Sequence, residues 1–292
     1  MEDMVLKTET IVLTQPMTGL ISLAIRYSAV IQPPESLTIK NNGIYPSGRS
    51  LNSAQISSAR PGPSTGKVTV TLSDYTNILR CLLESQYLKG KCVMVVRHSS
   101  STLTWTLAVL QAIIPALMIK AAILVEAAYV LPPLGDNNER ITQGIMNKKG
   151  VKSRKHTFPS RDKAAKWCCQ CIPWKVWDKH IFKCYMVALN CTLEQELNGY
   201  APNVPLLAGH LYPKLCVTYS VHGIFGECPE LYSNATRDRF FNGKDRQVMA
   251  SVQIMPKAGH LLMQEVPETA AEMVAKILKN SGHQHASPTL HL

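Results

Sequence analysis

A short apolar run followed at once by three serines limits the fold of this chain more than any other feature. Lys91–Val96 contains five consecutive apolar residues, and Arg97–Ser101 follows it directly. Thr104–Leu117 has the composition of a buried helix, and Ala121–Glu126 that of a second buried strand. Continuous apolar strands are typical of parallel sheets covered on both faces. The sequence therefore predicts a strand–helix–strand unit of an α/β fold.

The segments on either side of this unit extend the pattern. Apolar residues recur at helical spacing after Asp74, which we expect to be the helix N-cap, with Ser73 as the alternative. We predict the following further elements: edge strands at Ile11–Leu13 and Leu20–Ile25, a helix over Tyr75–Tyr87, strands over Cys216–Phe225 and Val248–Met255, and a helix over Pro267–Leu278.

The length of 292 residues suits one large domain or a core with an insertion. Residues 135–210 are polar, basic, interrupted by prolines and rich in tryptophan, which favours an inserted helical lid. We expect Trp167, Trp174 and Trp177 to form the core of that lid rather than to contact substrate. The predicted organisation is as follows: core, 1–134; lid, 135–210; core, 211–280; loose tail, 281–292.

The formal net charge of +11 raises the question of an anionic partner. Basic residues gather near Lys148–Lys155, but no helix-turn-helix, zinc-finger or RNA-recognition pattern accompanies them. A solvated basic face is therefore favoured, and no nucleic-acid partner is predicted. An anionic substrate, such as a carboxylate or a coenzyme A thioester, is a further alternative.

The nine cysteines and the N-terminus bear on the compartment. The first ten residues include acidic side chains and no apolar signal region, so secretion is not predicted and the thiols are expected to be free. Cys168 and Cys171 have the spacing of a zinc pair, but no second pair completes a four-ligand set. The sequence therefore predicts no metal and no cofactor.

One stretch is apolar enough to raise the question of a membrane span. Its longest uncharged run, Leu103–Ile119, is shorter than the about 20 residues that a helix needs to cross a bilayer. We therefore predict a buried helix and strand here, and no membrane span.

Ser99 stands where a nucleophilic serine would lie on a sharp strand-to-helix turn. The usual motif has glycine two residues before and two residues after the serine, because glycine tolerates the strained backbone and close packing. Arg97 and Ser101 occupy these positions here. Taken alone, the five-residue motif is a weak signal.

The order of later residues strengthens the prediction that Ser99 is a nucleophile. Glu126 ends the next predicted strand, and His260 follows a later strand in the segment Pro256–His260. At the carboxyl edge of a parallel sheet these side chains can converge on Ser99. His260 would act as the general base and Glu126 would orient it. Glu227, which follows another strand, is the alternative acid.

Several segments resemble fungal α/β-hydrolases, especially those encoded in clusters for toxins and other secondary metabolites. The segments that carry the resemblance are Val95–Ser100, Ile123–Glu126, Val221–Gly226, Val252–Leu261 and Gln264–Glu268. The resemblance implies an α/β-hydrolase fold and a serine hydrolase without cofactor, acting on a small-molecule ester or thioester, including acyl-CoA. It implies that Ser99 is the nucleophile, Glu126 the acid and His260 the base.

Such proteins are often peroxisomal and end in a tripeptide like Ser-Lys-Leu. The chain ends Leu290-His291-Leu292, which weakly resembles that signal, so the expected location is peroxisomal or cytoplasmic.

An oxyanion hole needs two backbone N–H groups. We assign one to Ser100 and the other to Ile44 in an early loop, although the family's His-Gly pair is absent there. The altered serine turn leaves an alternative open: a catalytically impaired hydrolase-fold protein that binds a metabolite or a partner. The sequence does not indicate an oligomeric state.

Overall fold

The computed structural model describes residues 4–14, 21–31, 71–86, 88–112, 118–131, 148–187, 193–198, 203–228, 230, 233–241 and 249–283. In the first two ranges it describes the backbone alone. The chain divides into two compact units, Met1–Lys67 and Val68–Leu292. This division separates the beginning of the predicted core segment 1–134 from the rest of it.

The first unit contains an antiparallel hairpin. Strand β1 (Met4–Thr14) pairs with β2 (Ile21–Ile31), so that Met4 lies opposite Ile31 and Thr14 opposite Ile21. Strands were predicted at both places, and their existence is confirmed. Both are longer than predicted because weak alternation marks only the most apolar part of each strand.

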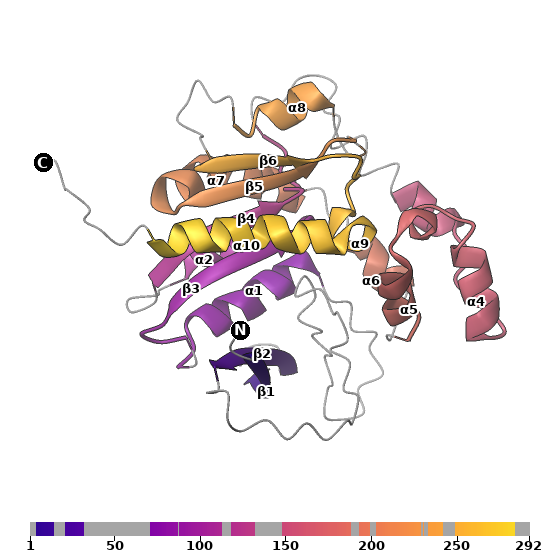
Figure 1. Ribbon diagram of the computed structural model, residues 1–292, viewed down its shortest axis with the longest axis horizontal. Helices are drawn as coiled ribbons and strands as arrows, with labels where there is room; N and C mark the ends of the chain where they lie inside the picture. The colour runs from indigo at the N-terminus through magenta and orange to yellow at the C-terminus, as the bar shows by residue number, and fades with distance from the viewer. Residues whose placement is uncertain are drawn as a thin grey trace, which may run out of the picture. The chain divides into compact units, whose positions relative to one another are not determined.

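The second unit is built on a parallel sheet of four strands in the order β3-β4-β5-β6. The strands are β3 (Cys92–His98), β4 (Met118–Val125), β5 (Val221–Gly226) and β6 (Ser251–Met255). Each is parallel to its neighbours. All four carboxyl ends therefore meet at one edge of the sheet, and this confirms the predicted parallel α/β architecture (Figure 1).

Helices cover both faces of this sheet. On one face, α2 (Ser100–Gln111) packs against both α1 (Leu72–Leu83) and α7 (Asn203–Thr218). The other face is covered by α10 (Pro267–His283), which follows the short helix α9 (Leu262–Glu265). Figure 1 shows α10 crossing the sheet. Each face has its own buried apolar cluster, as a three-layer architecture requires.

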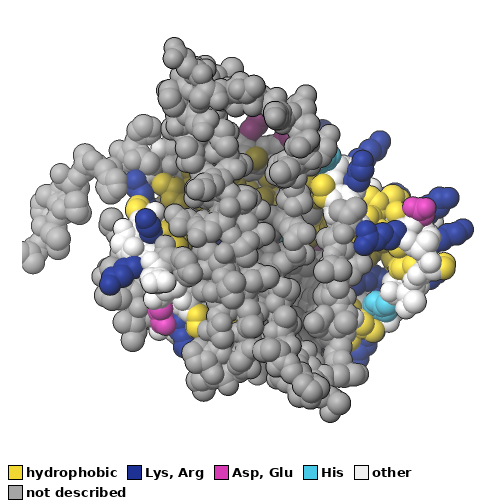
Figure 2. Space-filling view, turned by 90° about the horizontal axis from the view of Figure 1, so that it is seen from below, with side chains coloured by type: hydrophobic (Ala, Val, Ile, Leu, Met, Phe, Trp, Pro, Cys, Tyr) yellow, Lys and Arg dark blue, Asp and Glu magenta, His cyan; other side chains and the backbone are white. Residues whose placement is uncertain are grey.

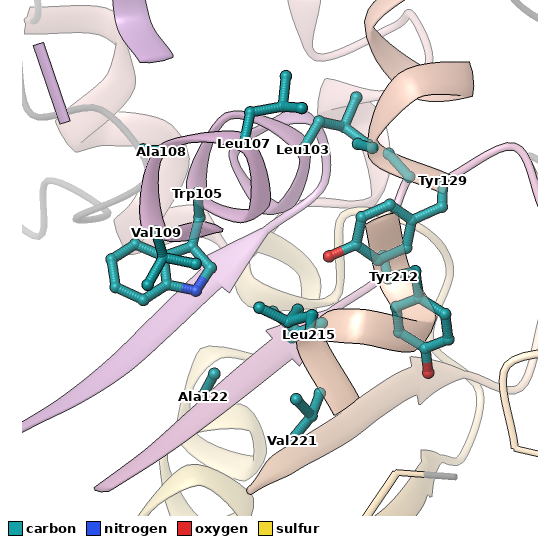
Figure 3. Close-up of a cluster of buried hydrophobic side chains, with 14 of the residues drawn as sticks. Leu103, Trp105, Leu107, Ala108, Val109, Ala122, Tyr129, Tyr212, Leu215 and Val221 are labelled. Atoms are coloured by element: carbon teal, nitrogen blue, oxygen red, sulfur yellow. The ribbon is translucent and has the colours of Figure 1, made fainter. Parts of the chain in front are cut away.

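The larger cluster contains side chains of α2, α7 and the sheet (Figure 3). Trp105 of α2 is only 2% exposed, and Tyr129 and Tyr212 are fully buried with their ring centroids 5.0 Å apart. The Tyr129 hydroxyl lies 2.6 Å from the Thr106 hydroxyl, and Tyr212 donates to the Phe240 carbonyl at 2.8 Å. The buried phenols are thus hydrogen-bonded, as burial in an apolar layer demands.

Helix α1 begins earlier than the predicted Tyr75, and Thr71 is its N-cap. The Asp74 amide donates to the Thr71 hydroxyl, and the Asp74 carboxylate accepts from the Thr71 amide at 2.8 Å. This reciprocal pair is a capping box. The prediction that Asp74 or Ser73 is the N-cap was therefore wrong, because Asp74 occupies the third helical position.

The predicted strand over Cys216–Phe225 was also wrong in its first half. Cys216 and Thr218 belong to α7, and β5 begins at Val221. The β-branched residues at the end of α7 imitate a strand, but Tyr212 and Leu215 of the same helix lie in the core. The predicted lid boundary at residue 210 falls inside α7, whose Val204 and Ala208 are also buried in the core.

Between β4 and β5 the chain forms a helical insertion. Residues 148–153 are helical, and α4 (Arg161–Cys168), the 3-10 helix η1 (Trp174–Val176), α5 (Lys179–Val187) and α6 (Leu193–Asn198) follow. Another short helix, α8 (Asn234–Asp238), lies between β5 and β6. Helix α10 continues through His283, past the predicted start of a loose tail at residue 281.

The three tryptophans of the insertion form an aromatic cluster with Tyr185. Ring centroids of Trp167 and Trp174 lie 5.9 Å apart, and those of Trp177 and Tyr185 lie 5.2 Å apart. Trp174 is 7% exposed. The structure confirms the prediction that these rings form the insertion's own core.

Within the described ranges, no helix is long and apolar enough to cross a membrane. The same ranges contain no group of His, Cys, Asp and Glu side chains placed to hold a metal ion. The cysteines of the described part, including Cys168 and Cys171, are free thiols.

Candidate active site

Three side chains predicted to act together meet at the carboxyl edge of the sheet. Ser99 follows β3, Glu126 follows β4, and His260 lies beyond the end of β6. The Ser99 hydroxyl oxygen lies 2.7 Å from His260 Nε2, and His260 Nδ1 lies 3.1 Å from Glu126 Oε2. Glu126 and His260 are buried, with 6% and 9% of their surface exposed. The structure therefore brings the serine, the histidine and the acid into one hydrogen-bonded chain.

The carboxylate fixes which imidazole nitrogen carries the proton. An ionised carboxylate accepts hydrogen bonds only, so the neutral His260 ring donates from Nδ1 to Glu126. Nε2 is then left with a lone pair that faces the Ser99 hydroxyl. A base in this tautomer can accept the serine proton.

Ser99 has the strained backbone expected of a nucleophile turn. Its φ is 53° and its ψ is −129°, a region that residues other than glycine rarely adopt. The Ser99 amide donates to the Val125 carbonyl at 2.9 Å. Thr102 donates from its hydroxyl to the Ser99 carbonyl at 2.6 Å and accepts from the Ala128 amide at 3.2 Å. These bonds join the serine turn to the segment that carries Glu126.

The two residues that replace the motif's glycines have distinct surroundings. The Ser101 hydroxyl donates to the His98 carbonyl at 2.7 Å and accepts from the His98 amide at 3.0 Å. Ser101 thus holds the turn together instead of merely crowding it. Arg97 lies with its guanidinium 5.5 Å from the Trp105 ring, where burial lowers the pKa of Arg97 to about 10.

Glu126 is held from two sides. Its Oε1 accepts from the Gly226 amide at 2.6 Å, while Oε2 faces His260. Its own φ of 48° turns the chain so that the side chain leaves the end of β4 toward the imidazole. The residue that donates to Glu126 must be glycine, because a Cβ on Gly226 would collide with the Ala258 carbonyl oxygen.

Glu227, the alternative acid, lies elsewhere. Its side chain is exposed, and Oε2 accepts from the Lys257 amide at 2.8 Å. Lys257 has a φ of 58°, so Glu227 holds the strained turn that leads from β6 to His260. The carboxylate that contacts the imidazole is that of Glu126.

His98 is a site residue that the sequence analysis missed. It is buried, and its Nε2 donates to the His260 carbonyl at 2.8 Å. Burial, and then repulsion from His260, lowers the pKa of His98 to about 4, so the ring is neutral at pH 7. His98 therefore ties the serine turn to the histidine segment. Its position directly before Ser99 was the available signal.

Two more glutamates hold the backbone around His260. The His260 amide donates to Glu230 Oε2 at 2.9 Å, and the Gly259 amide donates to Glu265 Oε2 at 2.8 Å. Burial raises the pKa of Glu265 above its ordinary value. No sequence spacing indicated either contact, because both depend on how the chain returns after β6.

The predicted oxyanion donors have different outcomes. Ser100 is the first residue of α2, where backbone N–H groups have no partner within the helix. The helix dipole also favours negative charge at this end. Ile44, the predicted second donor, lies outside the described residues.

Comparison with known proteins agrees at the level of fold. No protein-family model matches the sequence, and no curated protein matches it. The structure is similar to that of the peroxisomal α/β-hydrolase Lpx1 from Saccharomyces cerevisiae, with a TM-score of 0.56 and 15% sequence identity. That match covers 76% of this chain and 61% of the yeast protein, so the chain spans less than two thirds of the yeast protein's length.

A second similar structure is E-2-(acetamidomethylene)succinate hydrolase. Its TM-score is 0.55 at 13% identity, and the match covers 74% of this chain and 76% of that chain. Identities this low concern the fold and not the activity. With its parallel sheet flanked by helices and its helical insertion, the chain has the α/β-hydrolase fold.

Proposed function

We propose that this chain is a serine hydrolase that cleaves a small-molecule ester or thioester. The observation that carries the proposal is the 2.7 Å contact between the Ser99 hydroxyl and His260 Nε2, with Glu126 on the other ring nitrogen. A nucleophile, a base and an orienting acid in hydrogen-bond reach are the geometric signature of acyl transfer.

In the proposed mechanism Ser99 attacks the substrate carbonyl while His260 Nε2 takes its proton. Glu126 stabilises the imidazolium that forms. The Ser100 amide, together with a second donor that we assign to Ile44, stabilises the negative oxygen of the tetrahedral intermediate. His260 returns the proton to the departing alcohol or thiol, and water then releases the acyl group from Ser99 by the same steps. The chemistry uses no metal and no organic cofactor.

The narrower substrate class rests on the sequence resemblance. We propose an ester or thioester intermediate, including an acyl-CoA, of fungal toxin or other secondary-metabolite biosynthesis. The helical insertion would act as the lid of this site. The Asp178 amide, which precedes α5, donates to the Gln264 carbonyl of α9 at 2.8 Å and so anchors the insertion near the histidine segment.

The proposed location is the peroxisome, with the cytoplasm as the alternative. The similarity to a peroxisomal α/β-hydrolase supports it. The C-terminal residues Leu290, His291 and Leu292 lie outside the described residues. A fluorescent protein carrying these last residues should enter peroxisomes if they act as a signal, and remain cytoplasmic if they do not.

The alternative is a hydrolase-fold protein that binds its ligand without turnover. The observation in its favour is the replacement of both glycines of the serine turn by Arg97 and Ser101. Under this alternative, replacing both with glycine would create activity that the natural chain lacks. Under our proposal the same double substitution should lower the activity, because Ser101 supplies two hydrogen bonds to the turn.

Hydrolysis of short-chain p-nitrophenyl esters and acyl thioesters by purified variants tests the proposal. Ser99→Ala should lower kcat/KM by about 10⁴-fold or more. Ser100→Ala is the matched control, because the Ser100 side chain is exposed and its backbone N–H remains. Equal rates for the natural chain and Ser99→Ala would reject the proposal, and so would ligand binding without turnover in both.

A further inference from the structure

Most of the net charge of the molecule lies in one part of it. Residues 148–187 contain 11 Lys and Arg residues and two Asp residues, a formal charge of +9 out of +11 for the whole chain. The rest of the chain is therefore close to neutral. Such a concentration of like charge creates a positive potential over this part of the protein.

These basic side chains face solvent. Nine of the eleven are exposed, among them Lys175 of η1 and both Lys179 and Lys183 of α5. Lys179 and Lys183 are four residues apart and so share one face of their helix. Figure 2 shows dark-blue Lys and Arg side chains beside yellow hydrophobic ones at the right of the view, on the side where Figure 1 places the insertion.

Apolar side chains are exposed within the same surface. Ile172 is 76% exposed and Val176 is 53% exposed, and Lys175 lies between them in the chain. We call Ile172, Val176 and the exposed Lys and Arg side chains of residues 148–187 the basic insertion surface. Isolated exposed aliphatic side chains are common, but here two lie within five residues in the most basic part of the protein.

The aromatic cluster keeps these two side chains outward. Trp174 lies between Ile172 and Val176 in the chain and is buried against Trp167. Arg154 lies over the same Trp174 ring, with its guanidinium 5.2 Å from the ring centroid, and pairs with Glu196. The interior of the insertion is thus already filled by large rings. Ile172 and Val176 are therefore available to a partner.

We propose that the basic insertion surface docks the protein onto anionic phospholipid bilayers. Positive side chains are attracted to the negative surface of such a membrane, and small apolar side chains gain free energy by entering the acyl boundary. A nucleic acid would satisfy the lysines but would offer no apolar environment to Ile172 and Val176. Because Lys175 lies between the exposed Ile172 and Val176 in the chain, positive charge and apolar side chains stand close together here, which favours a lipid bilayer.

Docking of this kind would bring the membrane close to the candidate site. The insertion is joined to α9 by the hydrogen bond from the Asp178 amide to the Gln264 carbonyl, and α9 begins two residues after His260. The inference does not rest on the proposed hydrolase activity, since attraction to a bilayer needs no nucleophile. Ser99→Ala protein should bind membranes as the natural chain does.

Co-sedimentation of the full chain with lipid vesicles tests the inference. The protein should bind vesicles of phosphatidylcholine with about one third phosphatidylserine, and the binding should weaken steeply as salt rises from about 0.1 M to about 0.5 M. The triple variant Lys175→Gln/Lys179→Gln/Lys183→Gln should lower the partition coefficient about 100-fold. The double variant Ile172→Gln/Val176→Gln should lower it about tenfold.

Matched control variants lie elsewhere on the surface. Lys214, Lys276 and Lys279 are exposed lysines outside the insertion, and replacing them with Gln removes the same charge. Val217 is 74% exposed on α7, so Val217→Gln matches Ile172→Gln in exposure. Both controls should bind vesicles like the natural chain. All replaced side chains are exposed, and unchanged thermal unfolding would show that the variants fold.

Three results would overturn the inference. The first is equal binding to pure phosphatidylcholine vesicles. The second is an equal loss of binding in the test and control variants. The third is tight, salt-dependent binding to duplex DNA or RNA that the Ile172→Gln/Val176→Gln variant retains, with no binding to anionic vesicles, which would identify a nucleic-acid surface instead.

Discussion

The carboxyl edge of the sheet and the helical insertion use polar residues in opposite ways. At the edge, Glu126, His98 and His260 are buried and hydrogen-bonded to one another or to nearby backbone. In the insertion, most charged side chains are exposed and share one sign. The edge thus holds its polar groups in a fixed, hydrogen-bonded geometry, whereas the insertion presents a positive electrostatic field to solvent.

The largest expected effect concerns the geometry at the edge. His260→Gln should lower kcat/KM for ester hydrolysis by about 10⁴-fold or more, and Glu126→Gln by about 10³–10⁴-fold. Glu126→Gln removes the negative charge that stabilises the imidazolium. Glu227→Gln is the matched control and should keep near-natural rates, because Glu227 contacts the Lys257 amide and not the imidazole. A larger loss in Glu227→Gln than in Glu126→Gln would reverse the assignment.

The second effect concerns pH. Burial depresses the pKa of His98 in the folded protein to about 4, below its ordinary value of 6.5. Between pH 6.5 and pH 4 the unfolded chain binds a proton at His98 and the folded chain does not. Proton binding therefore stabilises the unfolded state relative to the folded state as pH falls. Stability present above pH 6.5 should decline toward pH 4 by on the order of 3 kcal/mol.

Urea unfolding across this pH range measures the decline. His98→Gln keeps a donor for the His260 carbonyl but cannot titrate, so its stability should fall less with acidity. His222→Gln should remove a further part of this loss of stability at acidic pH, because burial also lowers the pKa of His222. Identical pH profiles for the natural chain and His98→Gln would contradict the account.

The third effect contrasts packing in the two regions. Gly226→Ala should lower the free energy of unfolding by about 1–3 kcal/mol, because the new Cβ meets the backbone carbonyls of Ala258 and Gly259. Gly150→Ala in the insertion should be neutral or stabilising by up to about 1 kcal/mol, since nothing lies within 4 Å of its Cβ and the segment is helical. Chemical denaturation measures the free energy of unfolding of both variants. Equal destabilisation by the two substitutions would contradict this difference in packing.

The smallest effect concerns the glutamates that hold the histidine segment. Glu230→Gln should lower kcat about tenfold with little change in KM, because a small displacement of His260 slows proton transfer more than it weakens substrate binding. Steady-state kinetics with one ester separates the two parameters. A change in KM alone would mean that Glu230 contacts substrate rather than positions His260.

The sequence was sufficient for residues whose role follows from strand order. Ser99, Glu126 and His260 were predicted because each follows a strand of a parallel sheet, and the fold brings such positions to one edge. Cys216 was misassigned because its β-branched neighbours resemble a strand, and only packing against the core identifies the helix. Glu230 and Glu265 were missed because their partners are backbone amides near His260, and the sequence pattern did not indicate either contact.

Ser101 shows a further limit of the sequence. By residue type alone, Ser101 adds a side chain where the motif has glycine, whereas in the structure its hydroxyl bonds both backbone groups of His98. Residue type alone gives the volume of a side chain. The direction of its hydroxyl, which decides between strain and support, depends on the folded turn.

Mass spectrometry of the protein after reaction with a fluorophosphonate tests the central claim most directly. The reagent forms a covalent bond with an activated serine and should add one phosphonyl group, located on the peptide that contains Ser99. His260→Gln should abolish the reaction because it removes the base that activates the hydroxyl. A folded natural chain that remains unmodified, or that is modified equally in Ser99→Ala, would contradict the account.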